Sequence, residues 1–384
     1  MADTQTQSLR RTPLYDLHVA SGARMVPFAG YDMPVQFEGV KAEHLWTRAH
    51  AGLFDVSHMG PCFLFLKEGL GEAGAHERIS AALERLVPSD IAALKPGQGR
   101  LTVLLSKQGG ILDDLIVTRM PGSSLEGMLY IVVNGAVKQE DWAVFEQELS
   151  DVATLQRADD RILIALQGPD AEAVIAPHFP EAAELKFMRC AYIQKDSEKY
   201  MVSRCGYTGE DGFELLLPNN EVGISLVKSL LADERVKPIG LGARDSLRLE
   251  AGLCLYGHDM DATRDPVEVD LSWVIQKSRR VRADFPGADR ILNALENGPA
   301  EKRVGIQPLQ SAPAREGTEI HTDGERVGII TSGGVGPSTG RPIAMGYVRS
   351  DLAVSGTKLD LMVRGKPRPA EVADLPFIQP NYKR

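Results

Sequence analysis

Two adjacent carboxylates inside an apolar run are the first residues of this sequence that could do chemistry. The run extends from Gly109 to Val117 and contains Asp113 and Asp114. Aspartate is disfavoured in β-strands, and neighbouring aspartates repel each other. Because strand side chains alternate, Asp114 should share a face with Leu112 and Ile116, while Asp113 points the other way. We interpret the face of Asp114 as the inward, apolar one, where a carboxylate is costly unless it is partnered or used.

A second stretch, Arg204 to Leu215, combines a glycine-rich turn with another carboxylate in an apolar setting. Three glycines lie within seven residues, and such a backbone can pass close to a ligand. Tyr207 offers a ring for stacking, and Glu214 stands between two apolar residues of an expected strand. A carboxylate can form two hydrogen bonds to an N–C–NH₂ edge, such as that of a reduced pterin ring. The first stretch has a structural alternative: Asp114 can be an aspartate of a turn whose carboxylate accepts hydrogen bonds from backbone donors.

Three other patterns are weaker in their context. Gly69 to Gly74 matches G-x-G-x-x-G, but a hairpin follows instead of the parallel strand that a dinucleotide fold needs. Gly336 to Gly340 matches G-x-S-x-G, but the last histidine is His321, and a hydrolase needs a later one. We interpret these two as a flexible loop and a β-turn. Asp55 to His58 fits a buried capping arrangement or the rim of a site. The histidine spacings match no zinc motif, so no metal site is predicted.

The elements that hold these residues can be read from hydrophobic periodicity. Strands over 101–106 and 111–120, joined through Gly109-Gly110, predict a hairpin. A third strand over 129–133 and a helix over 137–148 follow, the helix with Trp142, Phe145 and Leu149 on one face. Other expected helices are 38–50, 76–86, 170–175 with Asp170 as its cap, 221–231 and 243–250. Other expected strands are 162–167, 200–202 and 213–217.

The sequence pattern changes near Leu292, where helical periodicity stops. Short strands separated by turn residues predict a small β-barrel or sandwich; they are 303–306, 319–321, 326–331, 344–348 and 358–363. The segment 284–300 carries two prolines and two glycines and is expected to be the linker.

Composition excludes several classes of protein. The 384 residues are too many for one ordinary core, so two or three domains are expected. A net charge of −9 argues against general nucleic-acid binding. The basic run Lys277 to Arg282 is either a solvated patch or a docking patch for an acidic partner. The four cysteines form no C-x-x-C pair, and no apolar run is long enough for a membrane span. The polar N-terminus lacks a secretory signal, so a cytoplasmic protein is expected.

Taken together, the motifs resemble the aminomethyltransferase, or T-protein, family of the glycine cleavage system. The resemblance covers Thr12 to Tyr382 and is specific because eight motifs occur in order. They are Thr12–Tyr15, Phe54–Met59, Gly109–Val117, Leu166–Pro169, Gly206–Glu214, Gly240–Asp245, Arg248–Gly252 and Leu271–Trp273. Tyr31 stands where many members have Trp, which keeps an aromatic residue.

The resemblance implies an α+β fold of three domains around a central folate site. Two α/β domains are interleaved along the chain, over 1–57 with 155–257 and over 58–154 with 258–290. Residues 291–384 form a C-terminal β-barrel domain. For a eukaryotic source, the resemblance implies the mitochondrial matrix instead of the cytoplasm.

The resemblance also implies a reaction. A lipoylated H-protein presents an aminomethyl group, ammonia leaves, and tetrahydrofolate, the co-substrate, becomes 5,10-methylenetetrahydrofolate. The family's essential aspartate corresponds to Asp114, which has three open roles: base, electrostatic stabiliser or positioning group. Folate contacts carry over to Glu214, Arg244 and Tyr382, with Asn134, Tyr207 and Met59 as neighbours. An ion pair of Arg244 with Asp245 or Glu250 is the structural alternative for that residue.

There are two rival interpretations, one in the same fold and one of a different class. A sarcosine- or dimethylglycine-oxidising flavoenzyme needs an additional flavin domain, for which the chain has no room. A non-enzymatic folate-binding protein of iron–sulfur cluster maintenance has a Cys immediately before the Tyr of the glycine motif. Here Gly206 precedes Tyr207 and Cys205 lies one residue earlier, so the enzyme is favoured.

Overall fold

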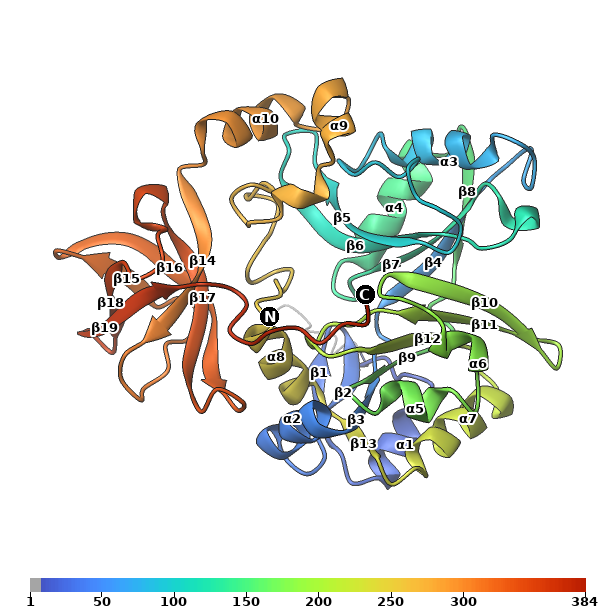
Figure 1. Ribbon diagram of the computed structural model, residues 1–384, viewed down its shortest axis with the longest axis horizontal. Coiled ribbons are helices and arrows are strands. Elements are labelled where there is room, and N and C mark those ends of the chain that lie inside the picture. Colours follow the sequence, from blue (N-terminus) through green and yellow to red (C-terminus); the bar gives the residue numbers. More distant parts are fainter. Residues whose placement is uncertain (1–7) are drawn as a thin grey trace, which may run out of the picture.

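The structure, a computed structural model, describes residues 8–384 as two mixed α/β bodies and a barrel around the middle of the molecule (Figure 1). The first body contains a six-stranded sheet of order β10-β11-β12-β9-β3-β13, antiparallel except between β13 and β3. Its strands are β3 (Ala51–Asp55), β9 (Ile162–Gln167), β10 (Arg189–Lys195), β11 (Glu198–Arg204), β12 (Gly212–Leu217) and β13 (Val236–Ile239). Its helices are α1 (Tyr15–Ala20), α2 (Val40–Ala49), α5 (Ala171–Ile175), α6 (Pro180–Ala183), α7 (Glu221–Leu231) and α8 (Leu241–Glu250), with a hairpin of β1 (Arg24–Phe28) and β2 (Tyr31–Gln36).

The second body contains a five-stranded antiparallel sheet of order β5-β6-β7-β4-β8. Its strands are β4 (Gly60–Leu66), β5 (Gly99–Leu105), β6 (Ile111–Arg119), β7 (Met128–Val133) and β8 (Ala153–Arg157). Helices α3 (Ala75–Leu83) and α4 (Lys138–Glu148) cover one face, where Trp142 and Phe145 of α4 meet Leu115 and Val117 of β6. The predicted hairpin is confirmed, and Gly109 has the positive φ of 84° that its turn requires.

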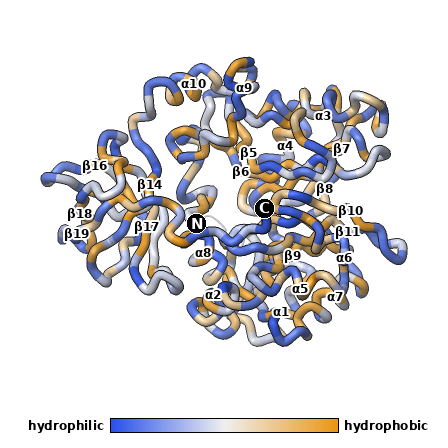
Figure 2. The backbone as a smooth tube through the Cα atoms, viewed as in Figure 1, coloured by the Kyte–Doolittle hydropathy of each residue, from blue (hydrophilic) through white to orange (hydrophobic). Residues whose placement is uncertain are grey.

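The two sheets share a core between them. Leu163 and Ala165 of β9 pack with Tyr130 and Val132 of β7 in one buried cluster, which we call the inter-sheet core. The alternate residues of β9 pack on the other side with residues of α5 and α7. Because β9 is covered on both faces, it is a continuous apolar run instead of an alternating one. Apolar stretches along the strands of both sheets are visible in Figure 2.

The chain passes between the bodies more than once, so the predicted interleaving is confirmed. After β3 it enters the second sheet for β4 to β8, and it returns for β9 to β13. Then η2 (Ser272–Val274), α9 (Lys277–Arg282) and α10 (Ala288–Asn297) follow, and Val274 and Ile291 pack against Val103 and Ile111 of the second sheet. The stated domain boundaries themselves stay predictions.

The C-terminal part is a closed six-stranded barrel of order β14-β17-β16-β15-β18-β19. It closes because β14 pairs with both β17 and β19. Its strands are β14 (Glu301–Pro308), β15 (Glu319–Thr322), β16 (Glu325–Gly336), β17 (Arg341–Arg349), β18 (Lys358–Val363) and β19 (Lys366–Ala373); the remaining short helices of the chain are η1 (Ser123–Leu125) and η3 (Ser350–Leu352). The barrel prediction is confirmed, and the G-x-S-x-G segment connects β16 to β17 as the expected turn.

Two expectations about local structure are wrong. The segment 284–300 is mostly helix α10, and its glycines, Gly287 and Gly298, bound that helix with φ of 66° and 82°. The glycines mark helix ends, so the segment between α9 and β14 is a helical connection, and helical periodicity does not stop near Leu292. Asp170 does not cap α5, because its backbone is already helical and its carboxylate contacts Nδ1 of His50 at 3.1 Å.

The last residues run back from the barrel across the first body (Figure 1). The backbone N–H of Phe377 donates to Glu250, that of Asn381 donates to Gly209, and Lys383 accepts from Phe187. The tail therefore lies over the glycine-rich turn that precedes Glu214. Within residues 8–384, no helix combines the length and the apolar character that a bilayer-spanning segment requires.

Candidate functional site

Strand β6 presents its two aspartates to different surroundings. The expected alternation is confirmed: Asp114 shares a half-buried face with Leu112 and Ile116, and Asp113 shares the other face with Leu115. The expectation that Asp114 takes the more buried face is wrong, since Asp113 has 0% exposure. The reason is that α4 covers the face of Asp113, whereas Asp114 lies on the side of the inter-sheet core.

Asn134, which directly follows β7, joins the two carboxylates. Its Nδ2 donates to Oδ1 of Asp113 and to Oδ1 of Asp114, both at 2.8 Å. Its backbone N–H donates to Oδ2 of Asp113, also at 2.8 Å. The predicted neighbours Asp114 and Asn134 are therefore brought together, and one amide group orients both carboxylates.

A third carboxyl group, Asp141 of α4, was missed by the sequence analysis. It is 2% exposed and hydrogen-bonds to Asp113. Burial first, and then the neighbouring carboxylates, raise the pKa of Asp141, and burial also raises the pKa of Asp113. Burial and the charge of Asp113 raise the pKa of Asp114 to about 8. We call Asp113, Asp114 and Asp141 the acid cluster.

The position of Asp141 carried a signal. It lies four residues before Phe145, so it occupies the buried face of the helix that the sequence predicted. A carboxylate on the apolar face of a helix is as unusual as one on the apolar face of a strand.

Glu214 lies on β12, opposite Ala165 of β9 and Ser203 of β11. It is half-buried, and its neighbour on the same face, Leu216, belongs to the inter-sheet core. Burial raises the pKa of Glu214, while the Arg244 guanidinium and the thiol of Cys205 oppose that shift. The carboxylate is therefore held beside a cation without a direct ion pair.

Arg244 of α8 extends over the ring of Tyr207, with its guanidinium carbon 4.8 Å from the ring centre. The ion-pair alternative is wrong, because Asp245 pairs with Arg248 at 2.8 Å and Glu250 pairs with His44 at 2.9 Å. Burial lowers the pKa of Arg244, and Glu214 opposes this shift. No ion pair of this guanidinium is formed within residues 8–384, so it is free to meet an acidic group of a ligand.

The carboxylates on the two sheets lie beside the same core. Asp114 is two residues from Ile116, which pairs with Val132 of the inter-sheet core. Met59 packs against that core, and burial raises the pKa of Tyr207, a shift to which the nearby carboxyl of Asp114 adds. Tyr130 of β7, a residue that the sequence analysis missed, is influenced in the same way by Glu214. One region between the sheets therefore holds carboxylates, a guanidinium, a ring and an amide.

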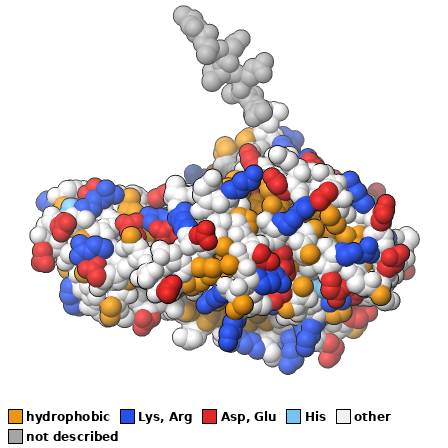
Figure 3. Space-filling model, turned by 90° about the horizontal axis from the view of Figure 1, so that it is seen from above, with side chains coloured by type: hydrophobic (Ala, Val, Ile, Leu, Met, Phe, Trp, Pro, Cys, Tyr) orange, Lys and Arg blue, Asp and Glu red, His pale blue; other side chains and the backbone are white. Residues whose placement is uncertain are grey.

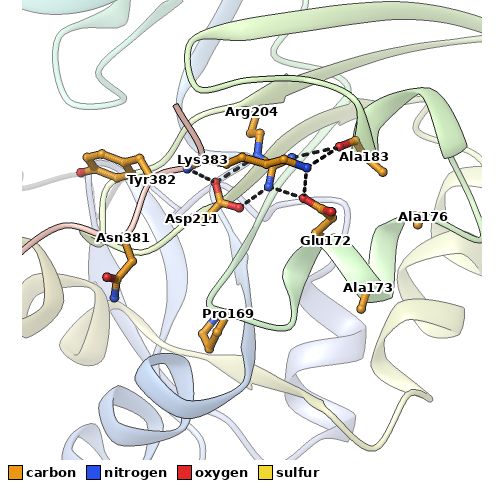
Figure 4. Close-up of a pocket in the computed structure, with 10 residues that line it drawn as sticks. All are labelled: Pro169, Glu172, Ala173, Ala176, Ala183, Arg204, Asp211, Asn381, Tyr382 and Lys383. Atoms are coloured by element: carbon orange, nitrogen blue, oxygen red, sulfur yellow. Dashed lines mark hydrogen bonds and ion pairs between the residues drawn. The ribbon is translucent and has the colours of Figure 1, made fainter.

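Tyr382 is in a different position from the other predicted residues. Its ring stacks on Phe187 at 4.1 Å, and it lines a surface groove of about 460 Å³ (Figure 4). The charges in that groove satisfy one another, because Arg204 pairs with Asp211 and Glu172, and Lys383 also pairs with Glu172. The groove presents no free charge to a ligand.

The sequence left two interpretations of Asp55 to His58, a buried capping arrangement or the rim of a site, and the structure shows the buried arrangement. Asp55 accepts hydrogen bonds from Oγ1 of Thr12 at 2.6 Å and from the backbone N–H of Ser57 at 2.9 Å, and His18 lies 2.8 Å away. His58 is also buried, and burial followed by the charge of Arg244 lowers its pKa to about 3. It is therefore a neutral side chain near Arg244.

Comparison with known proteins defines the class. Residues 14–279 match the family model of the GCVT N-terminal domain, and residues 302–379 match that of the glycine cleavage T-protein C-terminal barrel domain. The two matches correspond to the paired sheets and to the barrel. The chain belongs to the aminomethyltransferase, or T-protein, family of the glycine cleavage system.

Relatives are similar along nearly the whole chain. The probable mitochondrial aminomethyltransferase of Schizosaccharomyces pombe is 44% identical, covering 98% of this chain and 95% of the relative. The mitochondrial aminomethyltransferase of Saccharomyces cerevisiae is 42% identical, covering 98% and 96%. The crystal structure of the glycine cleavage system aminomethyltransferase T from Bartonella henselae has a TM-score of 0.88 at 42% identity, covering 98% and 100%.

Proposed function

We propose that this aminomethyltransferase uses tetrahydrofolate and a lipoylated H-protein as its substrates. The carrier presents an S–CH₂–NH₂ group on its dihydrolipoyl arm. N5 and N10 of the folate each form a bond to the methylene carbon and each give up a proton. The bonds from that carbon to nitrogen and sulfur break, so ammonia and the free thiol leave with those two protons. The products are 5,10-methylenetetrahydrofolate, ammonia and the reduced arm.

The geometry supports a division of labour in binding. The half-buried Glu214 can accept two hydrogen bonds from the N–C–NH₂ edge of a pterin ring. Tyr207 supplies a flat ring, and Arg244, which has no ion pair within the described residues, can meet a folate carboxylate or a charge at the reacting centre. Met59 adds apolar contact beside the same core. Tyr382 is proposed as a contact of the folate at its outer end.

Asp114 is the group that can act at the reacting carbon, and this is the observation on which the proposal chiefly rests. Its carboxyl is held by Asn134 at 2.8 Å, and its pKa is raised to about 8. A carboxyl that titrates near neutral pH can accept a proton from the folate and return one to the leaving amine. In its ionised form it stabilises the iminium-like carbon as ammonia departs.

The carrier must bring its arm to this region from the surface. The basic run 277–282 is less available than its sequence suggests, because Arg279 pairs with Glu84 and Asp284 and Arg282 also pairs with Glu84. Figure 3 shows acidic and basic side chains interspersed on the visible face. We therefore expect docking to depend on shape and on the arm more than on one charged patch. The mitochondrial names of the relatives favour a mitochondrial location for a eukaryotic source, and the cytoplasmic one stays a prediction.

The test is a single-turnover assay with an H-protein that carries the aminomethyl arm. Ammonia release and 5,10-methylenetetrahydrofolate are measured with and without tetrahydrofolate. We expect both products in equal amounts, with transfer dependent on the folate. Folate binding without any turnover would instead support the non-enzymatic folate-binding protein of iron–sulfur cluster maintenance.

A further inference from the structure

Asp141 on the buried face of α4 lies within hydrogen-bonding reach of Asp113 on β6, where the helix packs on the strand. Their exposures are 2% and 0%. No N–H or O–H donor among residues 8–384 reaches Oδ2 of Asp141. No lysine or arginine is among the described groups that chiefly set the pKa values of the acid cluster. The contact is therefore between two acids without a compensating cation.

Such a contact requires a proton. Two ionised carboxylates have no donor to share and repel each other strongly away from water. One proton between them supplies the O–H donor and reduces the charge of the pair from −2 to −1. Asp113 already accepts from the backbone and the side chain of Asn134, so Asp141 is the better place for the proton.

The pair is linked to Asp114 through one amide. Nδ2 of Asn134 has two hydrogens, and it directs one to Asp113 and the other to Asp114. Nδ2 also donates to the backbone carbonyl of Asp114 at 3.1 Å, but Asp113 holds both the amide and the backbone N–H of Asn134, so loss of its acceptor oxygens would release that residue at two points. We propose that Asp113 and Asp141 share one proton and act as positioning residues that hold Asn134, and through it Asp114, in the working arrangement. This inference rests on the proposed role of Asp114.

The surroundings give the shared proton a second consequence. The titratable groups that face the pair are Asp114 on β6, Glu140 on α4, Cys62 on β4 and Tyr256 on the segment after α8. All of them are acids. If the pair were fully ionised, its extra charge would oppose ionisation of Asp114. The proton on the pair therefore leaves room for one negative charge at Asp114, where the cationic intermediate needs it.

The first test measures the proton without using activity. Asp141→Asn keeps the shape and the hydrogen-bond donor but carries no titrating proton. The folded pKa of Asp141 is raised, so the wild type should lose stability as pH rises above the ordinary aspartate value near 4. The ratio of the folding constants of Asp141→Asn and wild type should then rise by up to about tenfold per pH unit between pH 5 and 8. Infrared spectra should show a protonated carboxyl band in the wild type that is absent from the variant.

Glu148→Gln, on the exposed side at the other end of the same helix, is the matched control and should follow the wild type at every pH. If Asp141→Asn also follows the wild type and no protonated carboxyl band is lost, the shared proton is overturned.

The second test separates positioning from chemistry. Asp113→Asn places an NH₂ group against the donors of Asn134, so kcat should fall on the order of 10²-fold with KM for tetrahydrofolate little changed. Asp141→Asn still donates to Asp113 but lacks the shared proton, so its kcat should fall by less than that of Asp113→Asn. A crystal structure of Asp113→Asn should show Asn134 turned away from Asp114.

An unmoved Asn134 in that structure would overturn the positioning role, whatever the activity. A wild type that shows the protonated carboxyl but transfers no aminomethyl group would count against the proposed function instead. The two failures are therefore distinguishable.

Discussion

The acid cluster and the surroundings of Glu250 bury carboxylates in opposite ways. Glu250 is fully buried, like Asp113, but it is surrounded by donors: Nε2 of His44 at 2.9 Å, Nη2 of Arg48 at 3.2 Å and the backbone N–H of Ser338 at 2.7 Å. Burial alone would raise its pKa, yet the bonds from His44 and Ser338 lower it to about 2. In the acid cluster one amide serves two carboxylates, and the pKa values go up.

The difference separates a structural role from a chemical one. Glu250 joins α2, α8 and the turn between β16 and β17, so its charge is neutralised where three parts of the fold meet. The acid cluster has no such compensation, and the Arg244 guanidinium over Tyr207 is also without an ion pair within residues 8–384. A charge left unbalanced inside a folded protein costs stability and is typical of a site that meets a ligand.

The largest effect should come from the acid cluster, whose charges have no compensating donors or cations. Asp114→Asn keeps the shape and the bond from Asn134 but loses the charge. We expect kcat to fall by roughly 10²–10⁴-fold, while folding and folate binding change little. Steady-state kinetics and calorimetry measure the two quantities separately.

The matched control for this variant has to be chosen from the structure. Asp113→Asn is not a suitable control, although Asp113 points to the opposite face, because it is buried and bonded to Asn134. Glu148→Gln, on the exposed side of α4, is the appropriate control and should keep full activity. If the ionised Asp114 is required, kcat of the wild type should rise with pH up to about 8, and Asp114→Asn should lack that step. A fully active Asp114→Asn would contradict the mechanism.

The same residues show how far the sequence goes. Alternation placed Asp113 and Asp114 on opposite faces, but it could not say which face a helix covers, because α4 comes from residues 138–148. Local rules also misread strand β19, whose prolines at 367 and 369 disfavour a strand. The barrel needs that strand for closure, and closure is a property of the whole domain. The motifs identified the family, whereas the proton-sharing pair required the packing of two distant segments.

At the buried carboxylate that is surrounded by donors, Glu250→Gln should lower the stability of the fold instead of the rate of the reaction. Removing one partner leaves His44 and Arg48 buried without their carboxylate, which typically costs about 3–5 kcal/mol. Chemical denaturation measures this loss. Glu316→Gln is the matched control, because Glu316 contacts His258 at 2.8 Å on the surface, and that pair should contribute less than about 1 kcal/mol. Equal losses would remove the distinction between the buried and the exposed pair.

Lowering the pH should destabilise the network around Glu250, whereas the acid cluster should lose stability when the pH rises. The folded pKa of Glu250 is lowered from 4.5 to about 2. Its contribution to stability is therefore present above about pH 5 and is lost as pH falls toward 2. Over that window the folding constant of the wild type should decrease by roughly 10²-fold more than that of Glu250→Gln. Parallel acid curves for the two proteins would show that Glu250 is not held ionised by its donors.

Glu214→Gln should have an intermediate effect, confined to binding. The amide can form one of the two proposed bonds to the pterin edge, but it loses the charge assistance, which should weaken tetrahydrofolate by about 1.5–3 kcal/mol. Calorimetric titration measures the change, and Glu221→Gln, an exposed residue at the start of α7, is the control. Unchanged affinity would remove Glu214 from the pterin site, and with it the argument that half-buried, unpaired charges in this chain mark ligand contacts.

The smallest effect should come from the basic helix α9, where the comparison predicts that compensated charges do little. Arg279 and Arg282 are neutralised by Glu84 and Asp284, and Arg280 donates to the carbonyls of Ile275 and Ser272. Lys277→Gln should therefore change kcat/KM for the H-protein by less than about threefold, since single rim charges mainly tune association. The salt dependence of kcat/KM should be similar in variant and wild type. A tenfold loss, or a salt dependence that disappears in the Lys277→Gln variant, would identify α9 as a docking patch for an acidic carrier. In that case a binding surface of this chain would not have to contain charges that lack an ion-pair partner.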